Sequence, residues 1–377
     1  MKKSLIALAV FGAFSGAALA EGSNVQLYGL IDLGVTHFSG GAEGNVTQLS
    51  SGVQSGSRIG VKGTEDLGGG LATIFDVETG FCASGSTTTQ ASQSAYCTGG
   101  PGGPGFMGRQ AWVGLKGDFG TVQAGRQYTL TFDDQANIDP FGYGLTGSIS
   151  NMGTVGVPAR ASQVLSYTSP NLSGFTIAGQ YMFGAGMQYL NTADQYKTTG
   201  GYNLQGSYAN GPVGVTLSYL RVNDQSGNAL VKDTEISGSY NFGVAKVVGY
   251  YSENKPNQNA QLATGAGTTK SPYVYSPAGL DQIKAYMLGV TVPVGPGSIL
   301  ASYTHLSDST VSNKGAKQYA VGYTYSLSKQ TNLYASYAHI SNDTAATYAV
   351  GDSTDGGFAP TAGGSSSGLG FGIRHQF

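Results

Sequence analysis

Residues 369–377 read LGFGIRHQF, and this stretch decides the fold. Every second residue faces one way, and most of these residues are large and apolar: Leu369, Phe371, Ile373, His375 and Phe377. The residues between them are glycine, arginine and glutamine, so the segment alternates as a half-wet strand does. Chain ends usually fray, yet we expect this strand to run to Phe377. The pattern predicts a last strand that pairs with the first and closes a barrel, with lipid on its apolar face.

Residues 25–35, VQLYGLIDLGV, show the same alternation near the other end of the sequence. Val25, Leu27 and Ile31 share one predicted face, whereas Tyr28 and Asp32 share the other. Strands with lipid on one side and water on the other are typical of outer-membrane barrels. We therefore expect the first and last strands to be neighbours.

Residues 1–20 have the three parts of a secretory signal peptide. Lys2 and Lys3 supply the positive charge, residues 5–14 are apolar, and residues 18–20 (ALA) form a small-x-small cleavage site. We predict cleavage after residue 20 and a single barrel domain over residues 21–377. Because no later segment has the ~20 apolar residues of a membrane helix, an exported membrane protein of this sequence would be a barrel.

The composition suits strands that face water on one side. Charged residues make up only 11% of the chain, tyrosine occurs 24 times, and the mean hydropathy is -0.10. Uncharged polar residues supply the polarity, as in a wet barrel lumen with tyrosine girdles. The aromatic content argues against disorder. With 19 basic and 21 acidic residues there is no basic excess, and we expect no nucleic-acid partner.

The two cysteines, Cys82 and Cys97, lie in one segment rich in glycine, serine and threonine. Export permits a disulfide, and two thiols make it the simplest pairing. Two cysteines without a nearby histidine fall short of a zinc ligand set. We therefore predict a disulfide in a long loop, no metal site and no cofactor.

The connections between the alternating runs are short and long in turn. Short ones, rich in Gly, Asn and Pro, are predicted at 66–69, 117–120, 169–171, 210–212, 241–243, 293–297 and 328–330. Long ones are predicted at 39–55, 83–105, 128–159, 185–198, 252–279 and 342–364. This rhythm predicts an all-β, antiparallel, up-and-down transmembrane barrel of about 16 strands, which is wide enough for an aqueous channel.

Basic residues fall on the predicted water face of two strands. Arg58 and Lys62 alternate with apolar residues, and so does Arg160. Arg109 and Arg126 instead share the parity of apolar neighbours, and an arginine facing lipid costs up to about 2–4 kcal/mol at the midplane. We expect these two to lie at a rim or beside a bulge that resets the alternation.

The connection 128–159 carries three carboxylates, Asp133, Asp134 and Asp139, together with aromatic residues. Connections of this length are usually functional or disordered. One hypothesis folds it into the barrel, which would bring its carboxylates opposite the wall arginines. The alternative is an extracellular flap with solvated charges, and the residues alone favour neither.

Several segments together resemble the general diffusion porins of beta-proteobacterial outer membranes, the Neisseria/Bordetella type of Gram-negative porin. They lie at 25–35, 57–81, 108–129, 165–174, 321–339 and 372–377. The resemblance implies a homotrimer of 16-stranded barrels whose third long loop narrows the pore. It also implies a wall of arginines (Arg58, Arg109, Arg126 and Arg160, with Lys62 beside them) facing acidic residues of that loop.

In such a family Phe377 is expected to act as the signal for the outer-membrane assembly machinery. Relatives often carry a Pro-Glu-Phe-Gly-Gly-like stretch in the third loop, whereas this chain has Asp139-Pro140-Phe141-Gly142. The expected function is passive diffusion of ions and small hydrophilic solutes through the outer membrane lipid. Four arginines against two or three carboxylates predict a weak anion preference.

Two other classes of function compete with a pore. Residues 364–368 (GSSSG) match the G-x-S-x-G pattern of a hydrolase, but that motif needs a strand-to-helix turn and no helix is expected to follow. A barrel protease or phospholipase is therefore the weaker hypothesis, and we expect no enzyme. An adhesin is the third, although nothing in the glycine-rich loops encodes a partner.

Overall fold

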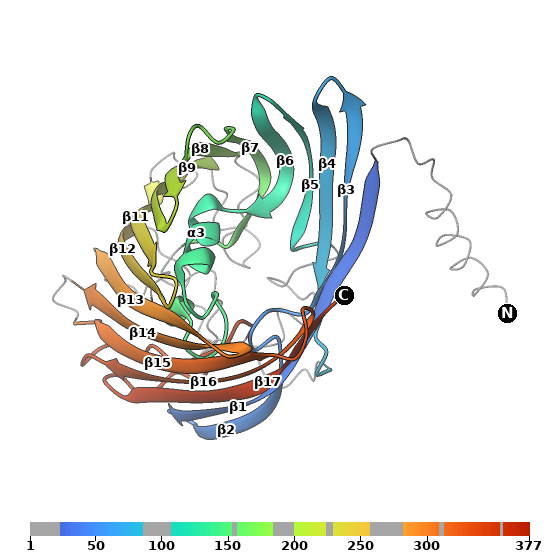
Figure 1. The fold of residues 1–377 in the computed structure, drawn as a ribbon. Coiled ribbons are helices and arrows are strands. Elements are labelled where there is room, and N and C mark those ends of the chain that lie inside the picture. The colour runs from blue at the N-terminus through green and yellow to red at the C-terminus, as the bar shows by residue number, and fades with distance from the viewer. Residues whose placement is uncertain are drawn as a thin grey trace, which may run out of the picture.

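The computed structural model describes residues 23–85, 107–152, 157–183, 200–223, 229–256, 282–308, 313–354 and 357–377. Their strands form one antiparallel sheet that closes into a barrel (Figure 1). The first strands are β1 (Asn24–Gly41), β2 (Gly44–Ser51), β3 (Arg58–Gly68), β4 (Leu71–Gly80), β5 (Gln110–Gly117), β6 (Gly120–Tyr128), β7 (Arg160–Thr168) and β8 (Phe175–Phe183). The remaining ones are β9 (Gly200–Asn210), β10 (Val213–Asn223), β11 (Ala229–Asn241), β12 (Lys246–Pro256), β13 (Ile283–Val294), β14 (Gly297–Asp308), β15 (Ala316–Ser326), β16 (Thr331–Asn342) and β17 (Ser365–Gln376).

The described strands occupy sixteen positions around the barrel. β1 is long enough to pair with β3 over its first half and with β2 over its second half, so β2 and β3 follow one another along the same edge. β1, this shared position and the fourteen strands β4–β17 complete the ring. Closure occurs where β1 pairs with β17, from Leu30 opposite Gln376 to Ser39 opposite Ser367. The predicted barrel of about 16 strands is confirmed.

The two faces of the strands differ as the alternation predicts. On β17, Phe371 is 52% exposed on the outward face, whereas its neighbour Gly370 is buried. On β1, Leu27 is 53% exposed and Asp32 is fully buried on the inward side. The apolar outward face is what a lipid environment requires of a barrel strand. None of the described helices is long and apolar enough to span a membrane.

One predicted connection is wrong. Residues 39–55 were expected to form a long loop, but β1 continues to Gly41 and returns at once as β2. Gly44 has a φ of 105°, a left-handed value that glycine adopts at little cost, and it opens the return strand. The loop proper is residues 52–57, which turn inward: Val53 is fully buried, and Asp32 accepts hydrogen bonds from the backbone nitrogens of Gln54 (2.8 Å) and Ser55 (2.6 Å).

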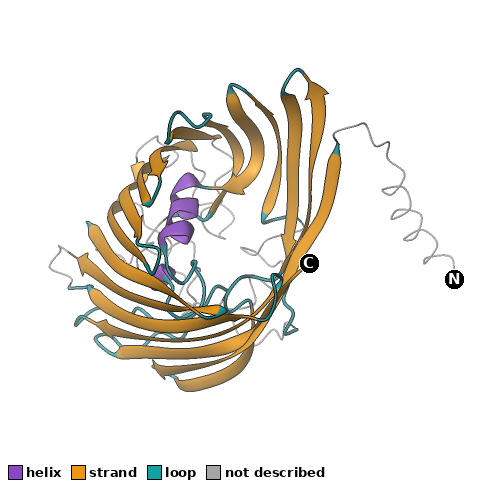
Figure 2. Cartoon of the chain, in the orientation of Figure 1, coloured by secondary structure: helices purple, strands orange, loops and turns teal. Residues whose placement is uncertain are grey.

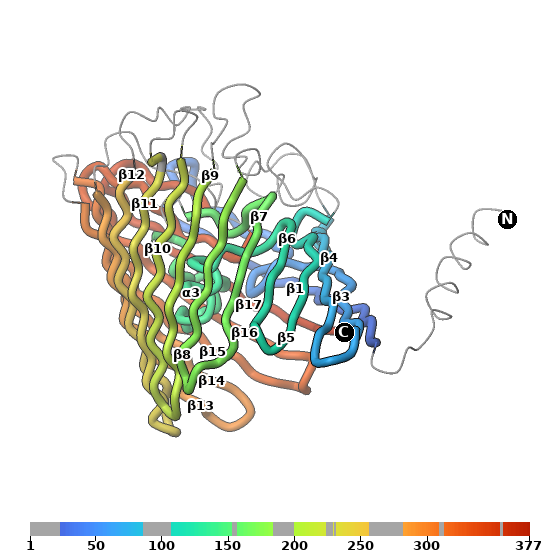
Figure 3. The backbone as a smooth tube through the Cα atoms, turned by 90° about the horizontal axis from the view of Figure 1, so that it is seen from above, coloured from blue at the N-terminus to red at the C-terminus, as the bar shows by residue number. Residues whose placement is uncertain are grey.

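Short connections join the strands along one rim, and they fall where the sequence predicts them (Figure 3). The predicted long connections 83–105, 185–198 and 252–279 lie largely outside the described residues. So do Cys97 and the predicted signal peptide, and therefore the Cys82–Cys97 disulfide and the processing at residue 20 stay predictions.

The third long connection lies inside the barrel. It begins with α3 (Leu130–Ile138), whose N-terminus is capped by the Thr129 hydroxyl accepting from the Phe132 backbone nitrogen, and it ends beyond the 3-10 turn η1 (Ile149–Asn151). Both ribbon views show α3 within the ring of strands (Figures 1 and 2). The predicted inward-folded third loop is confirmed, and the hypothesis of an external flap is wrong.

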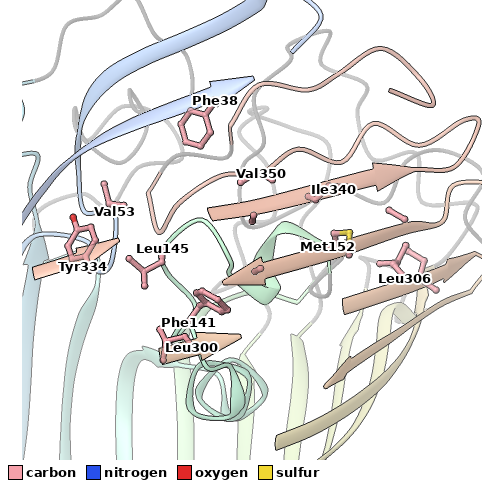
Figure 4. Close-up of a cluster of buried hydrophobic side chains, with 14 residues drawn as sticks. Phe38, Val53, Phe141, Leu145, Met152, Leu300, Leu306, Tyr334, Ile340 and Val350 are labelled. Carbon is pink, nitrogen blue, oxygen red and sulfur yellow. The ribbon is translucent and has the colours of Figure 1, made fainter. Parts of the chain in front are cut away.

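Apolar side chains hold the second half of this loop against the wall. Phe141, Leu145 and Met152 are 1–2% exposed and belong to one cluster with residues of the facing strands (Figure 4). The strand members of this cluster include Leu300 on β14, Ala320 on β15 and Tyr334, Ala338 and Ile340 on β16. Burial of each large side chain contributes about 1.5–3 kcal/mol, so the loop is a packed part of the barrel.

Polar contacts fasten α3 itself to the strands beside it. Gln135 donates its amide to Glu235 on β11 and to the Tyr250 hydroxyl on β12, which in turn donates to Glu235 at 2.6 Å. Thr131 bonds to Asn203 on β9. All of these side chains are buried. Hydrogen bonds shielded from water are stronger than exposed ones, so these contacts fix the position of α3 against the wall.

We predict that Glu235→Ala loosens α3, because it leaves the Gln135 amide and the Tyr250 hydroxyl buried without their acceptor. Each such group costs about 1–3 kcal/mol. Backbone hydrogen exchange over residues 130–138 should speed up. Glu235→Gln is the matched control, since it keeps an acceptor oxygen, and its new amide can donate to Asp233, which is already a side-chain hydrogen-bond partner of Glu235. Equal exchange in both variants would refute this anchoring role.

We also predict that deletion of Phe377 impairs closure of the barrel. The backbone nitrogen of Phe377 donates to Gly29 O and its carbonyl accepts from Gly29 N, both at 3.0 Å. Loss of these bonds leaves the backbone groups of Gly29 unpaired at the end of the β1–β17 seam, and a bilayer offers them no partner. The yield of folded barrel, followed by heat-dependent electrophoretic migration, should fall. Phe377→Tyr retains both backbone bonds and a ring, and a yield equally low for this variant would contradict closure as the cause.

Candidate functional site

Two arginines of the wall converge on one carboxylate. Glu78, on β4, receives Arg109 Nε at 2.6 Å and lies 3.7 Å from Arg58 Nε on the neighbouring β3. The Glu78 and Arg109 side chains are 4% and 5% exposed, whereas that of Arg58 is 23% exposed. A carboxylate buried with an arginine at this distance fixes the guanidinium in place, while Arg58 keeps access to lumen water.

Tyr128, at the end of β6, joins Arg109 to Arg160. Its hydroxyl accepts from Nη2 of each arginine at 2.7 Å, and the guanidinium of Arg160 lies over its ring, 4.3 Å from the centroid. The ring also stacks on Phe132 of α3 at 5.0 Å. One phenol therefore links the arginines of the wall to the helix of the third loop.

Arg109 and Arg126 share the parity of outward-facing apolar residues, and the structure shows a local reason for each. Arg109 directly precedes the first residue of β5 and so is free of the strand alternation. Arg126 lies in a bulge, because the register of β6 against β7 shifts between Gly125 and Gln127. Its guanidinium donates to the Gly108 carbonyl and to Ser162 Oγ. Rim position and bulge are the two arrangements expected for these residues.

Lys62 lies one row of inward-facing residues nearer the short turns than Glu78. It is paired in register with Asp76 on β4, and its Nζ is 4.9 Å from the centroid of the Tyr28 ring. The Tyr28 hydroxyl donates to Asp76 at 2.7 Å and to Glu78 at 3.2 Å. The basic and acidic groups of β3 and β4 therefore form one continuous polar surface on the lumen side.

The three loop carboxylates go to three different places. Asp133 is exposed on α3, and Arg160 is the cation that acts on it. Asp134 accepts a hydrogen bond from Ser237 on β11 at 3.0 Å. Asp139 is 5% exposed and accepts from the backbone nitrogens of Phe141, Tyr143 and Ile149 at 3.0–3.1 Å. Of the three, only Asp133 is open to water beside the arginines, and Asp139 shapes the loop.

The surroundings of Asp133 and Asp139 alter their acidity. Enclosure by the barrel raises the pKa of Asp133 to about 6, although the carboxylate itself touches water, and the charge of Arg160 opposes this rise. Burial likewise raises the pKa of Asp139 to about 6, against its three backbone hydrogen bonds. Asp133 can therefore change its charge at mildly acidic pH.

The sequence reasoning missed two central members of this site. Asp76 and Glu78 share one strand face with Val77 between them, so parity could have placed Glu78 on the lumen face that carries Arg58. Tyr128 carried no signal, because its role depends on the bulge and on the fold of the third loop. Arg374 on β17 was placed on the inward face but not assigned to the wall; its Nη1 lies 3.5 Å from Ser55 Oγ.

The serine-rich pattern at 364–368 lies where β17 begins, and Ser365, Ser366 and Ser367 are strand residues. His339 and Ser367 are 2.8 Å apart on neighbouring strands, and Ser367 has the parity of the outward-facing Leu369. The strand-to-helix turn that a nucleophile elbow needs is absent from this described segment. Over the described ranges, no three His, Cys, Asp or Glu residues cluster in a way that could hold a metal.

Comparison with known proteins agrees with this geometry. The profile of the family described as Gram-negative porin matches residues 7–345. Outer membrane porin protein 32 of Delftia acidovorans is 34% identical, and an outer membrane porin of Bordetella pertussis is 30% identical; both alignments cover all of each chain. The solved structure titled as an anion-selective porin from Comamonas acidovorans aligns with a TM-score of 0.73 at 29% identity, covering 94% of this chain and 100% of that one.

The chain thus forms a closed barrel with a lipid-compatible outer face. A loop folds into the lumen, and a wall of arginines lies beside that loop. The relatives that match the chain over its full length are outer membrane porins. The chain belongs to the Gram-negative porin family and forms a channel for passive diffusion through the outer membrane.

Proposed function

We propose that this channel prefers small anions weakly and that the arginine wall (Arg58, Arg109, Arg126 and Arg160) sets the preference where the third loop narrows the pore. The observation that carries the proposal is the cluster in which Glu78 and Tyr128 hold Arg58, Arg109 and Arg160 beside α3. Guanidinium groups stay ionised at all physiological pH values, so they act as permanent positive charges.

The balance of charge at this place supports the direction of the preference. Glu78 is shared by two arginines, and of the three loop carboxylates only Asp133 is open to water near Arg160. The surplus of positive charge favours entry of anions. The solved relative from Comamonas acidovorans is titled an anion-selective porin.

The proposal extends to assembly and to substrate class. The family resemblance supports a homotrimer, insertion by the outer-membrane assembly machinery and transport of ions and small hydrophilic solutes. It also favours a channel over an enzyme, since the family and the relatives above are named as porins.

We predict that replacing Arg58 and Arg160 by glutamine shifts selectivity toward cations. Loss of a fixed charge near an ion's path changes its free energy on the order of 1 kcal/mol, which is several-fold in the permeability ratio. Zero-current potentials under a salt gradient measure this shift. Arg221→Gln is the matched control. The residues on either side of Arg221, Leu220 and Val222, are buried on the inward face of β10, so Arg221 has the outward parity and lies away from the lumen path.

Unchanged selectivity and conductance in the Arg58→Gln, Arg160→Gln channel would contradict the proposal. An equal shift in the Arg221→Gln channel would also contradict it, because the effect would then be one of total charge. Potassium chloride near 0.1 M suits the measurement, since charges are screened beyond ~10 Å at that ionic strength.

We predict that acidification strengthens the anion preference. The pKa of Asp133 is about 6, so lowering the pH from 7.5 to 5 protonates this carboxylate and removes its negative charge from the lumen. The ratio of anion to cation permeability should therefore rise as the pH falls through 6. Asp133→Asn should show the higher ratio already at pH 7.5 and a smaller change on acidification. A full pH response in this variant would assign the effect to another group.

A further inference from the structure

Four lumen-facing residues stand in one row across four strands. The strand registers pair Gln26 on β1 with Lys62 on β3, Lys62 with Asp76 on β4, and Asp76 with Trp112 on β5. Their outward neighbours, such as Val25, Leu27 and Val113, are 53–62% exposed on the opposite face. The row therefore lies on the lumen wall, between the arginine wall and the short turns.

This row forms the floor of a pocket. The pocket has a volume of about 260 Å³, and its lining also includes Asn24, Gly63, Thr64, Ile74 and Phe75. An engineered protein cavity of ~150 Å³ is large enough to bind benzene, so a small aromatic solute fits in this pocket.

The pocket contains one cationic side chain, Lys62, and one carboxylate, Asp76. Asp76 is 8% exposed, and its oxygens accept from the Tyr28 hydroxyl at 2.7 Å and from the Gln110 amide at 3.4 Å. Lys62 has no ion pair within 4.0 Å among the described residues, and its ammonium lies near the Tyr28 ring. Lys62 is therefore available to pair with an anionic group of a solute. Asp76 is already hydrogen-bonded, and its negative charge disfavours a solute that carries two carboxylates.

Trp112, with Ile74 and Phe75, supplies the apolar part of the pocket lining. Its indole is held by a hydrogen bond from Nε1 to Gln110 Oε1 at 3.0 Å, so the ring has a set position in the wall. Rigid aromatic surfaces bind flat rings with little loss of side-chain entropy and favour stacked or edge-on contacts. It is the single tryptophan of the chain.

We propose that this pocket is a binding subsite for monoanionic aromatic carboxylates, with Lys62 holding the carboxylate, Trp112 contacting the ring, and the amide and hydroxyl groups of Asn24, Gln26 and Thr64 serving polar substituents. A solute that leaves the arginine wall toward the short turns meets this subsite next. The subsite rests on the channel function and is independent of the anion preference proposed above.

The single tryptophan makes the subsite directly observable, because its fluorescence lifetime reports on this pocket alone. Benzoate is the probe; acetate carries the charge without the ring, and benzyl alcohol carries the ring without the charge. We expect benzoate to change the lifetime of Trp112 saturably and to reduce the single-channel current. Acetate and benzyl alcohol should need at least about tenfold higher concentrations, since each lacks one of the two contacts.

Variants separate the two contacts. Lys62→Gln should raise the benzoate concentration for half-maximal change at least about tenfold. Trp112→Phe should keep the current reduction because it keeps a ring, whereas Trp112→Leu should lose it. Lys246→Gln is the matched control: Lys246 begins β12, at the short-turn rim on the far side of the barrel from β3 (Figure 1), and its loss should leave the benzoate response as in the wild type.

The inference is overturned if acetate acts as strongly as benzoate, or if Lys62→Gln responds as the wild type does. It is also overturned if the channel conducts normally and benzoate changes neither the lifetime nor the current. Absence of ion conduction in the folded barrel would instead overturn the channel function, so the two failures are distinguishable.

Discussion

The pairing of β1 with β17 is the constraint on which the rest of the molecule depends. A bilayer offers no partner to backbone N–H and C=O groups, so a sheet that spans it must have no open edge. The bonds between Gly29 and Phe377 complete this closure at the short-turn end. Once the ring is closed, its outward residues must be apolar and its inward residues are free to be polar.

A ring of sixteen strand positions leaves a lumen that side chains of the wall do not fill, and the third loop occupies part of this space. Its apolar half packs on β14–β16, and α3 is tied through Gln135 and Thr131 to β9, β11 and β12. The loop is thereby held against the far side of the barrel from β3 and β4 (Figure 1). The water path is left beside the strands that carry the arginines.

The arginines on this path are held in position by a neutral phenol as well as by a carboxylate. Tyr128 accepts from two arginines without cancelling either charge, whereas Glu78 compensates one unit among two. A guanidinium held by a phenol is positioned and remains positively charged, which is what an electrostatic filter for passing ions requires. The same wall continues into the Lys62 and Trp112 pocket, where positive charge meets an aromatic surface.

Alternation along residues 25–35 and 369–377 indicated the closed barrel, and alternation along 58–62 indicated the lumen side of Arg58 and Lys62, because a strand's period of two is a local property. Gly, Asn and Pro in the connections predicted the short turns. The sequence by itself could not place Arg126, whose face depends on a bulge in the pairing with β7, nor choose between Asp133, Asp134 and Asp139. The loop-like composition of residues 39–55 also led to the prediction of a long loop where the structure has the hairpin of β1 and β2. These features were decided by tertiary structure, because contacts between distant strands and the folded loop determine where each charge points.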